Sequence, residues 1–428
     1  MVCFMGMKGT GDWSDSDFRP KSWREGILFR YPNGSAPLTA IMSKLGSQPV
    51  SDPQFYWFTQ GLPTQRADVT GVYTDSGLSV AYVSDGKADD TLYVKMSSND
   101  VAQFRYGHQV LLRYASDLTV DVNTVVIGRD DNGASSYIQV KLIEDDDNSS
   151  SYDLSDCDVA LIVGNLNSEG AAMPDALSYE PTKWSNYTHI WRTSLEITRT
   201  QMQTTMRTGD SYKELKRQCL QLHSIEIEKS LLFSVASEKT GDNGKPRRST
   251  MGLIPAIVSG GTVNNYVTNA SFAGKTWLQG GEDWLDQQLA TIFKYGANEK
   301  LCFAGQTALL GLNRLVKAGA IFQFTPATTS YGIRIIQWVT PFGTINIMTH
   351  PLFSYEATTS KSMVIFEPKD LKFRYIQDTI FKNDDRLRKG DWTSRDGLKE
   401  EYLTEAGLEY HHPNGWGYLY GIGDDNSL

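Results

Sequence analysis

The strongest hydrophobic pattern in the sequence is helical and lies near the middle of the chain. From Ser211 to Val235, apolar residues recur three, four or seven positions apart. They form two stripes, with Leu220, Ile227, Leu231 and Val235 in one and Leu215, Cys219 and Leu222 in the other. The pattern predicts a helix roughly 38 Å long, capped by Asp210 or Ser211. Two stripes indicate that the helix packs on more than one side, with Ile227 in the core.

The region before this helix has the alternation and turn residues of β structure. A hairpin is predicted for Val122–Gly128 and Tyr137–Ile143, because the Asn132–Gly133 step between them favours a tight turn. Gln109–Tyr114 and Asp158–Val163 add two further strands. Four or more short strands within about 60 residues indicate a small barrel or sandwich.

The chain begins with an irregular segment. Residues 1–65 contain recurrent Gly and Pro and few core signals, so the segment is predicted to lie as an arm on the protein's own body or on a neighbour. Within it, Pro37–Leu45 has the pattern of a short amphipathic helix, and Phe55–Thr59 is an aromatic strand candidate. Residues 186–206 are predicted to be extended, because Thr, Ile and Trp recur there without Pro or Gly.

Beyond the helix, the sequence predicts a mixture of helices and strands. After a loop at Gly241–Arg248, the alternating patterns indicate one compact α+β domain of about 80–100 residues. The expected helices are Glu282–Phe293 and Gln306–Lys317, and the expected strands are Lys300–Gly305, Ile333–Val339, Thr344–Thr349 and Met363–Glu367. The tail, Leu371–Leu428, alternates strand-like and turn-rich stretches.

Composition and charge narrow the class of protein. The 428 residues suffice for about two to four domains with substantial cores. No apolar run reaches the roughly 18 residues that span a bilayer, and the first 24 residues lack a signal-peptide pattern. The net charge of −9 argues against wrapping of nucleic acid by bulk electrostatics. Two small basic clusters are more consistent with surface salt bridges than with phosphate contacts: Lys245, Arg247 and Arg248, and Arg386, Arg388 and Lys389.

No catalytic, cofactor-binding or metal-binding residue is assigned from the sequence. The four cysteines are widely scattered, as expected for thiols in a reducing cytoplasm. Gly241–Lys245 has the wrong spacing for a phosphate-binding loop. Gly415–Gly417 follows no clear strand and opens no helix, so it does not meet the context of a dinucleotide-binding motif.

Acidic and histidine clusters have plain structural interpretations. The run Glu144–Asp147 is predicted to be a solvated loop rather than a divalent-cation site, because it lacks spaced oxygen ligands. His411 and His412 are adjacent and are interpreted as ordinary loop histidines. Glu226 and Glu228, in the middle of the predicted helix, are interpreted as paired or solvent-facing rather than catalytic.

The predicted features occur in a distinctive order: an irregular arm, a long β excursion, an extended return strand, a long two-sided helix and a small α+β domain. Several local stretches accompany this order: Pro37–Thr39, Phe55–Trp57, Glu169–Pro174, Ser185–Ile190, Ile197–Thr200, Ile227–Glu228, Arg247–Leu253, Met363–Phe366 and Leu398–Tyr402. Over roughly residues 37–420, the chain resembles the Hong Kong 97-type major capsid proteins of tailed bacteriophages. The stretches resemble a subgroup with a small β-barrel inserted in the extended loop before the helix.

This resemblance implies an α+β, HK97-like capsid fold. Residues 1–65 would be the N-terminal arm, and residues 66–185 the extended loop with its inserted barrel at about 105–165. The peripheral domain would comprise 186–275, with a spine helix at 211–235. The axial domain would comprise 276–360, and 361–428 would return to the peripheral domain and form the C-terminal segment.

The resemblance also implies a function, partners and a location. The protein would be a major capsid protein without enzymatic activity or cofactor, assembling as hexamers and pentamers into the icosahedral or prolate shell of a virion. Assembly would take place in the cytoplasm of the host bacterium. Portal proteins, and scaffolding and cement or decoration proteins where the virus encodes them, would bind the shell. The shell would enclose double-stranded DNA without sequence-specific binding and without a membrane. The sequence before Pro37 is too short for a cleaved scaffolding segment, so assembly would use a separate scaffold or none.

Two other classes of protein fit parts of the sequence. A tail or decoration protein of a virion would also use a small β-barrel. A β-rich hydrolase or other carbohydrate-active protein would account for the 10 Trp and 21 Tyr residues, if exposed aromatics converged on paired carboxylates. A long helix between β segments favours the shell protein.

Overall fold

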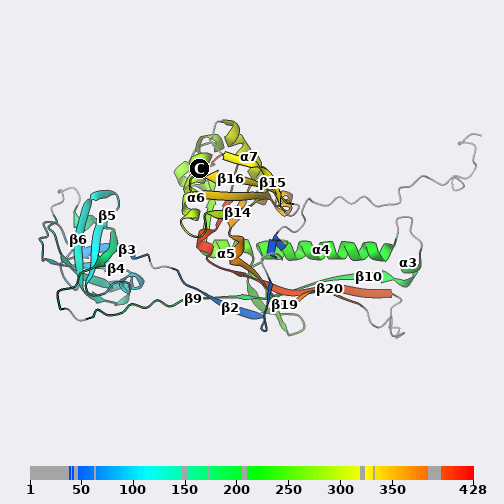
Figure 1. Cartoon of the computed structure of the whole chain (residues 1–428), viewed down its shortest axis with the longest axis horizontal. Helices are drawn as coiled ribbons and strands as arrows, with labels where there is room; N and C mark the ends of the chain where they lie inside the picture. Colours follow the sequence, from blue (N-terminus) through cyan, green and yellow to red (C-terminus); the bar gives the residue numbers. More distant parts are fainter. Residues whose placement is uncertain are drawn as a thin grey trace, which may run out of the picture. The chain divides into compact units, whose positions relative to one another are not determined.

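The computed structural model describes residues 38–39, 41–42, 47–61, 64–146, 153–170, 173–204, 210–318, 323–330, 333–383 and 397–428. The chain divides into two compact units, whose elements are labelled in Figure 1. The barrel unit is Gln60–Thr182, and the main unit consists of Met1–Thr59 together with Lys183–Leu428. Among the described residues, no helix combines the length and the apolar character needed to cross a membrane.

The barrel unit contains a closed barrel of six antiparallel strands in the order β3-β4-β7-β6-β5-β8. The strands are β3 (Arg66–Tyr73), β4 (Thr91–Met96), β5 (His108–Tyr114), β6 (Asp117–Asp130), β7 (Tyr137–Leu142) and β8 (Val159–Asn165). Buried and less buried residues alternate along β4 and β7, as expected for strands with one face on a core. The core inside the barrel is mostly aliphatic and includes Val94, Val110, Leu112, Val126 and Val140.

The barrel is larger than the range of about 105–165 expected from the sequence. The predicted hairpin is confirmed as β6 and β7, with Gly133 at a φ of +56° in the connection. The barrel also contains β3 and β4, and β3 closes it by pairing with β8, so that Arg66 lies opposite Leu161. Closure joins the first strand of the barrel to the last one, and local alternation carries no information about such a pairing.

The main unit contains a four-stranded sheet with a long helix on it. The strand order is β1-β19-β20-β10, and the bounds are β1 (Ser47–Pro49), β19 (Leu371–Lys382), β20 (Gly397–Tyr410) and β10 (His189–Thr198). β1 is parallel to β19, and the other pairs are antiparallel. Helix α4 (Ser211–Phe233) lies along β10 and β20 (Figure 1). The indole N–H of Trp191 on β10 donates to Ser230 Oγ on α4 at 3.0 Å and joins the two layers.

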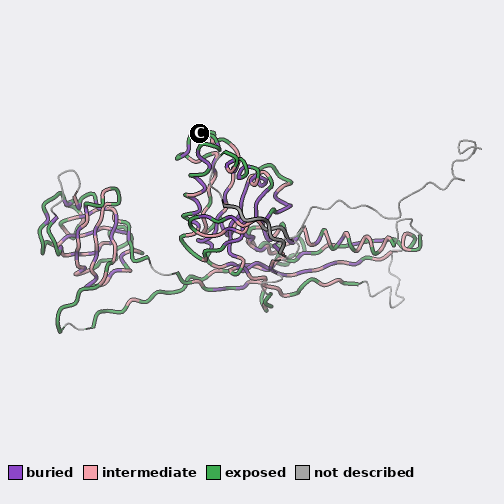
Figure 2. Tube along the Cα trace, turned by 45° about the horizontal axis from the view of Figure 1, so that its top comes forward, coloured by how far each residue is buried: buried purple, intermediate pink, exposed green. Residues whose placement is uncertain are grey.

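The predicted long helix is confirmed, and it ends at Phe233, two residues earlier than expected. Asp210 is its N-cap, since its carboxylate accepts hydrogen bonds from the backbone N–H groups of Tyr212 and Lys213. The prediction that the helix packs on two sides is wrong for much of its length, because Leu220, Leu222 and Val235 are 41%, 56% and 60% exposed. The reason is that the sheet covers one side only, and a second layer, α5 (Leu253–Gly260), packs only on part of α4. Figure 2 shows the resulting exposed positions along the helix.

The second sheet of the main unit has seven strands in the order β13-β21-β18-β14-β17-β16-β15. They are β13 (Thr262–Asn265), β14 (Glu299–Ala304), β15 (Gln323–Ser330), β16 (Ile333–Thr340), β17 (Gly343–Thr349), β18 (Met363–Phe366) and β21 (Gly417–Tyr420). Helices α6 (Trp277–Phe293) and α7 (Gln306–Ala318) share one hydrophobic core with this sheet. The predicted helices and strands of the α+β region are confirmed, but β13, β18 and β21 extend the sheet beyond residues 276–360.

Strand β14, in the middle of the seven-stranded sheet, contributes to both hydrophobic cores of the main unit. Cys302 and Ala304 belong to the core with α6 and α7, whereas Leu301 and Phe303 belong to a second core. That second core also contains Ile227 of α4, as the sequence predicted. A strand with alternate residues in two cores is buried on both faces, so β14 connects the two cores.

Two further segments differ from the sequence prediction. Within the stretch 186–206 expected to be extended, α3 (Arg199–Gln203) is helical, because the Thr198 side chain caps it by accepting from Gln201 N. The expected loop Gly241–Arg248 belongs to a hairpin of β11 (Ser237–Thr240) and β12 (Pro246–Ser249). Threonine is found both in strands and at helix N-caps, and short polar strands lack a hydrophobic alternation. The sequence pattern therefore predicted neither α3 nor the hairpin.

The N-terminal segment is described only in part. Leu38, Thr39, Ile41 and Met42 are helical, which agrees with the short helix predicted in this region, and residues 1–37 lie outside the described residues. The aromatic strand is confirmed as β2 (Gln54–Thr59), which pairs with β9 (Thr182–Tyr187). The whole barrel unit is therefore inserted between two paired strands.

Candidate assembly surfaces

A buried carboxylate on α4 holds the beginning of the described chain. Glu228 accepts hydrogen bonds from Leu38 N at 2.7 Å, Thr39 N at 2.9 Å and Thr39 Oγ1 at 2.6 Å. His350 Nε2 is 2.9 Å from the same carboxylate, and both side chains are fully buried. Leu352 N donates to His350 Nδ1, so the imidazole proton is on Nε2 and points at Glu228.

This arrangement fixes where the N-terminal segment meets the main unit. A buried carboxylate is costly unless donors replace its hydration, and here two backbone N–H groups, a hydroxyl and an imidazole do so. Glu228 is therefore paired, as the sequence suggested, and its partners lie 190 residues earlier and 122 residues later in the chain. Glu226 is exposed and accepts from Thr193 Oγ1 at 3.0 Å.

A buried ion pair fixes the seven-stranded sheet to the chain near Gly415. Lys300 Nζ lies 2.8 Å from Glu367 Oε1 and donates to the carbonyl oxygens of Gly415 at 2.8 Å and Tyr295 at 3.1 Å. Burial disfavours the charged form of Glu367, but the hydrogen bonds from Lys300 and Ala297 outweigh it and lower the pKa of this carboxyl. This ion pair stabilises the fold, because the partners of both charges belong to the same chain.

The pKa of Glu409 on β20 is likewise set by two opposing effects, burial and hydrogen bonding. Burial raises its pKa, but hydrogen bonds from His411 and Arg374 outweigh burial, so the pKa of Glu409 is lowered below its usual value of 4.5. His411 Nε2 is 2.7 Å from this carboxylate, which gives the histidine an ordinary structural partner. Within the described part of the chain, no group of His, Cys, Asp and Glu could hold a metal ion.

We expect acid to destabilise the main unit through Glu367 and Glu409. Both pKa values are lower in the folded than in the unfolded chain, so the stabilisation is complete above about pH 4.5 and is lost as the pH falls through the folded-state values. Urea midpoints measured from neutral to acidic pH will show the loss. Glu367→Gln is the comparison, because a neutral side chain removes its share of the pH dependence. An equal slope for wild type and this variant would contradict the assignment.

The acidic run in the barrel unit lies in a loop, as predicted, and Glu144 and Asp145 are exposed, but Asp146 is buried rather than solvated. Asp145 accepts from Ala88 N at 2.7 Å, and Asp146 is buried and accepts from the Tyr82 hydroxyl at 2.7 Å. Glu144 accepts from Asn123 N at 2.6 Å. These carboxylates hold two loops together, because acceptors are needed for donors that the barrel strands leave unpaired. Asp147 lies outside the described residues.

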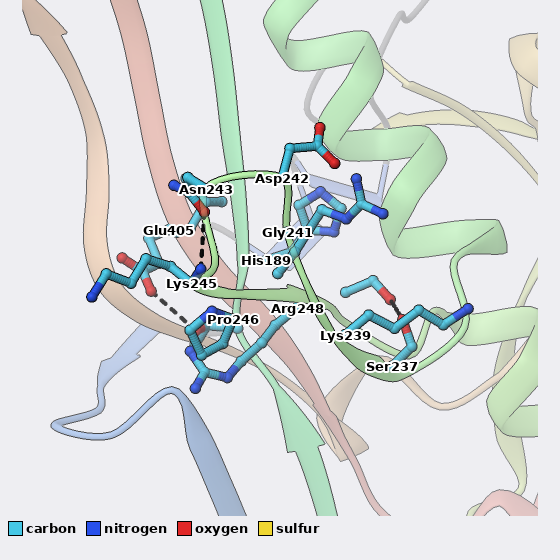
Figure 3. A pocket seen from close by; sticks show the side chains of 14 residues that line it. His189, Ser237, Lys239, Gly241, Asp242, Asn243, Lys245, Pro246, Arg248 and Glu405 are labelled. Carbon is cyan, nitrogen blue, oxygen red and sulfur yellow. Dashed lines mark hydrogen bonds between the residues drawn. The ribbon is translucent and has the colours of Figure 1, made fainter.

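The hairpin β11–β12 forms one wall of an open cavity of about 730 Å³. Figure 3 shows its side chains, with His189 and Glu405 contributed from β10 and β20. Of the basic cluster predicted to form salt bridges, Arg248 pairs with Glu238 at 3.1 Å. Lys245 and Arg247 have no ion pair within the described ranges. The cluster Arg386, Arg388 and Lys389 lies outside the described residues.

The cysteines described are unreactive. Cys157, Cys219 and Cys302 are free and buried, and burial raises the pKa of the Cys157 thiol to about 12. Gly415–Gly417 leads into edge-adjacent strand β21 and not into a helix, so it has no context for binding a dinucleotide. The geometry of the described residues thus supplies anchoring contacts and exposed surfaces.

Comparisons with known proteins identify which structural protein this is. The sequence matches the family described as SU10 major capsid protein over residues 25–423. The major capsid protein of Pseudomonas phage PaMx41 is 25% identical over 366 residues, which cover 83% of this chain and 78% of that protein. Among solved structures, the capsid of Myoviridae phage XM1 aligns at 12% identity and a TM-score of 0.39, over 60% of this chain and 81% of that one. The capsid of a native GTA particle aligns at 7% identity and a TM-score of 0.47, over 97% and 99%.

The family match spans most of the chain and defines the class: a structural protein of a tailed phage that forms the head shell, rather than an enzyme. The chain belongs to the SU10 major capsid protein family. It is therefore a component of the capsid of a virion. This confirms the sequence prediction of a major capsid protein and decides against both alternatives, a tail or decoration protein and a carbohydrate-active protein.

Proposed function

We propose that this capsid protein builds its shell from hexamers and pentamers with the HK97-like layout expected from the sequence. In this layout, residues 1–65 are the arm and 66–185 the extended loop that carries the barrel. Residues 186–275 form the peripheral domain with α4 as its spine, 276–360 the axial domain, and 361–428 the return. The observation that carries the proposal is the insertion of the barrel between paired strands β2 and β9, in a chain that matches the family over residues 25–423.

Several elements of a single chain are suited to contacts with other copies. β10 and β15 are the terminal strands of their sheets in the described part of the chain, and such edges accept strand addition. Leu220 and Leu222 give α4 an exposed apolar strip. Copies related by rotation can repeat modest contacts of this kind around a ring and across a shell.

The remaining partners follow from the same role. Portal proteins, and scaffolding and cement proteins where the virus encodes them, would bind the shell, which would enclose double-stranded DNA without reading its sequence. The net charge of −9 supports this, since an acidic shell repels packaged DNA rather than holding it. No membrane is needed for the assembly.

The test of the layout is assembly and imaging. The chain is expressed alone and together with neighbouring phage genes, and the products are sized and imaged by electron cryomicroscopy. We expect shells in which hexamers and pentamers are resolved and each copy has its barrel on an extended loop. A product that never forms rings or shells under any combination would overturn the proposal.

The arm can be tested by deletion. Removing residues 1–36 leaves the donors of Leu38 and Thr39 to Glu228 in place, so the main unit is expected to fold with an unchanged urea midpoint. We expect the yield of shells to fall by about ten-fold or more, because contacts contributed by an arm to its neighbour are lost. Particles formed at the normal yield would show that the arm is dispensable.

A further inference from the structure

Charge is distributed very unevenly between the two units. The barrel unit, residues 60–182, contains 7 Lys and Arg residues against 20 Asp and Glu residues, a net charge of −13. The remainder contains 34 against 30, a net charge of +4. The overall charge of −9 therefore conceals a strongly acidic barrel and a slightly basic main unit. Such a separation favours contacts between unlike parts of different copies.

The acidity of the barrel is concentrated at the end opposite its two connections to the main unit. The chain enters at Arg66 on β3 and leaves at Asn165 on β8, and these antiparallel strands put both connections at one end. The described loop residues 74–90, 143–146 and 153–158 lie at the other end, which we name the acidic end. They include 10 Asp and Glu residues and one basic residue, Lys87.

The two loops of the acidic end form one surface. Asp89 N donates to Leu142 O, and the Tyr82 hydroxyl donates to Asp146 across the loops. Six of the described carboxylates are exposed: Asp85, Asp89, Asp90, Glu144, Asp145 and Asp156. Lys87 lies 3.6 Å from Asp145 and Lys141 lies 2.8 Å from Asp89, so two lysines offset part of the charge and the surface stays negative.

The main unit has a complementary surface on the hairpin β11–β12. Lys239 lies directly opposite Arg247 in the antiparallel pair, with Lys245 in the turn. Like charges directly opposite each other in a β pair are destabilising, and neither residue has an ion pair among the described residues. These side chains line the open cavity of about 730 Å³ (Figure 3), which we name the basic groove. An anionic partner in the groove would remove the repulsion.

We infer that the basic groove of one copy binds the acidic end of the barrel of a second copy. The inference rests on the proposed function, since it requires several copies in one assembly. Each copy has one groove and one acidic end, so the contact is between unlike surfaces and repeats from copy to copy, as a ring requires. Lys239, Lys245 and Arg247 provide three cations for carboxylates such as Asp90 and Glu144.

A carboxylate cluster fits this groove better than DNA does. Asp242 and Glu405 also line it, and they would repel a continuous line of phosphates. Proteins that bind DNA through its backbone make about six to ten phosphate contacts, whereas the groove has three cations without ion pairs among the described residues. A protein surface with spaced carboxylates can pair with the cations and avoid Asp242 and Glu405.

Charge reversal on each side tests the contact in the full-length chain. The groove variant is Lys239→Glu, Lys245→Glu and Arg247→Glu, and the barrel variant is Asp85→Lys, Asp89→Lys and Asp90→Lys, which leaves Glu144 and Asp145 in their structural hydrogen bonds. A matched control, Lys275→Glu, Lys294→Glu and Lys317→Glu, changes the net charge of the main unit equally at exposed positions outside α4 and the groove. Before assembly is measured, tryptophan fluorescence establishes that the main unit of each variant is folded, and circular dichroism establishes that its barrel, which contains no Trp, is folded.

We expect the groove variant and the barrel variant each to assemble with about ten-fold or lower yield, because like charges then face each other. The six-fold variant, which reverses both surfaces, restores the yield, and the control assembles like wild type. If the six-fold variant stays as defective as either triple variant, the contact is wrong. Normal shells with less packaged DNA from the groove variant would overturn it in favour of a DNA contact. Absence of shells from the wild type would instead contradict the proposed function.

Discussion

Replacing Glu228 with alanine is expected to lower the free energy of unfolding of the main unit by about 3–5 kcal/mol. The carboxylate is the acceptor for Leu38 N and for both donors of Thr39, and it faces His350 Nε2 at 2.9 Å. Removal leaves these buried donors without an acceptor and opens a cavity at the same place. Each unsatisfied buried donor costs about 1–3 kcal/mol, although the costs do not add fully.

The measurement of this effect uses the distribution of tryptophan. All 10 Trp residues lie outside residues 60–182, so intrinsic tryptophan fluorescence in urea reports on the main unit and not on the barrel. Glu226→Ala, two residues away on the same helix and exposed, is the control and should change stability by less than about 0.5 kcal/mol. A Glu228→Ala protein with the urea midpoint of wild type would contradict the role assigned to this carboxylate.

The Glu228 variant also separates anchoring from folding. Glu228→Gln keeps one acceptor oxygen and the size of the side chain, so we expect a smaller loss of stability than for alanine. If the main unit remains folded, the segment near Leu38 should become more susceptible to limited proteolysis, because its backbone bonds to the carboxylate are weakened. Unchanged proteolysis in a folded Glu228→Gln protein would mean that other contacts hold the segment.

The second large effect is expected at the neighbouring position. Ile227 is 5% exposed in the core shared by α4 and the two sheets. Ile227→Asp places a charge there without a partner, and the desolvation cost and lost packing together exceed about 5 kcal/mol, a large part of the stability of a typical domain. We expect this variant to lose the cooperative fluorescence transition and to accumulate as insoluble protein.

A matched substitution on the same helix isolates burial as the cause. Leu220 is 41% exposed, so Leu220→Asp should leave a folded main unit with stability within about 1 kcal/mol of wild type. The same variant tests the exposed strip of α4, because a charge there should reduce assembly if other copies cover it. Soluble, assembly-competent Ile227→Asp protein would show that α4 is not the core helix described here.

Features with a local physical cause were predictable from the sequence. The long helix follows from apolar spacing and from Asp210, whose carboxylate caps the first turn. The hairpin at Gly133 follows from a residue that tolerates positive φ. Where one residue type serves two local structures, the prediction was wrong: Thr198 resembles a strand residue and caps α3.

The candidate surfaces were much less predictable than the elements. The basic residues Lys245 and Arg247 were recognised, but their position in a hairpin with Lys239 opposite Arg247 was not. The acidic run at Glu144–Asp147 was recognised, yet the hydrogen bond of Asp145 to Ala88, 57 residues earlier in the chain, was not. A cluster of charged residues in the sequence indicates an exposed surface. Only the pairing of distant strands shows which of these charges remain without partners.

By itself, the sequence determined the helices, most strands, the acidic character and, through resemblance, the class of capsid protein. The helices and strands depend on the spacing of apolar residues over short stretches of the sequence, so neighbouring residues determine them. The tertiary structure alone decided the closure of the barrel by β3 and β8, the partners of Glu228 and the grouping of β14 with β18 and β21. Those pairings join residues far apart in the chain, and the free energy that selects them comes from burial and hydrogen bonding in the complete fold.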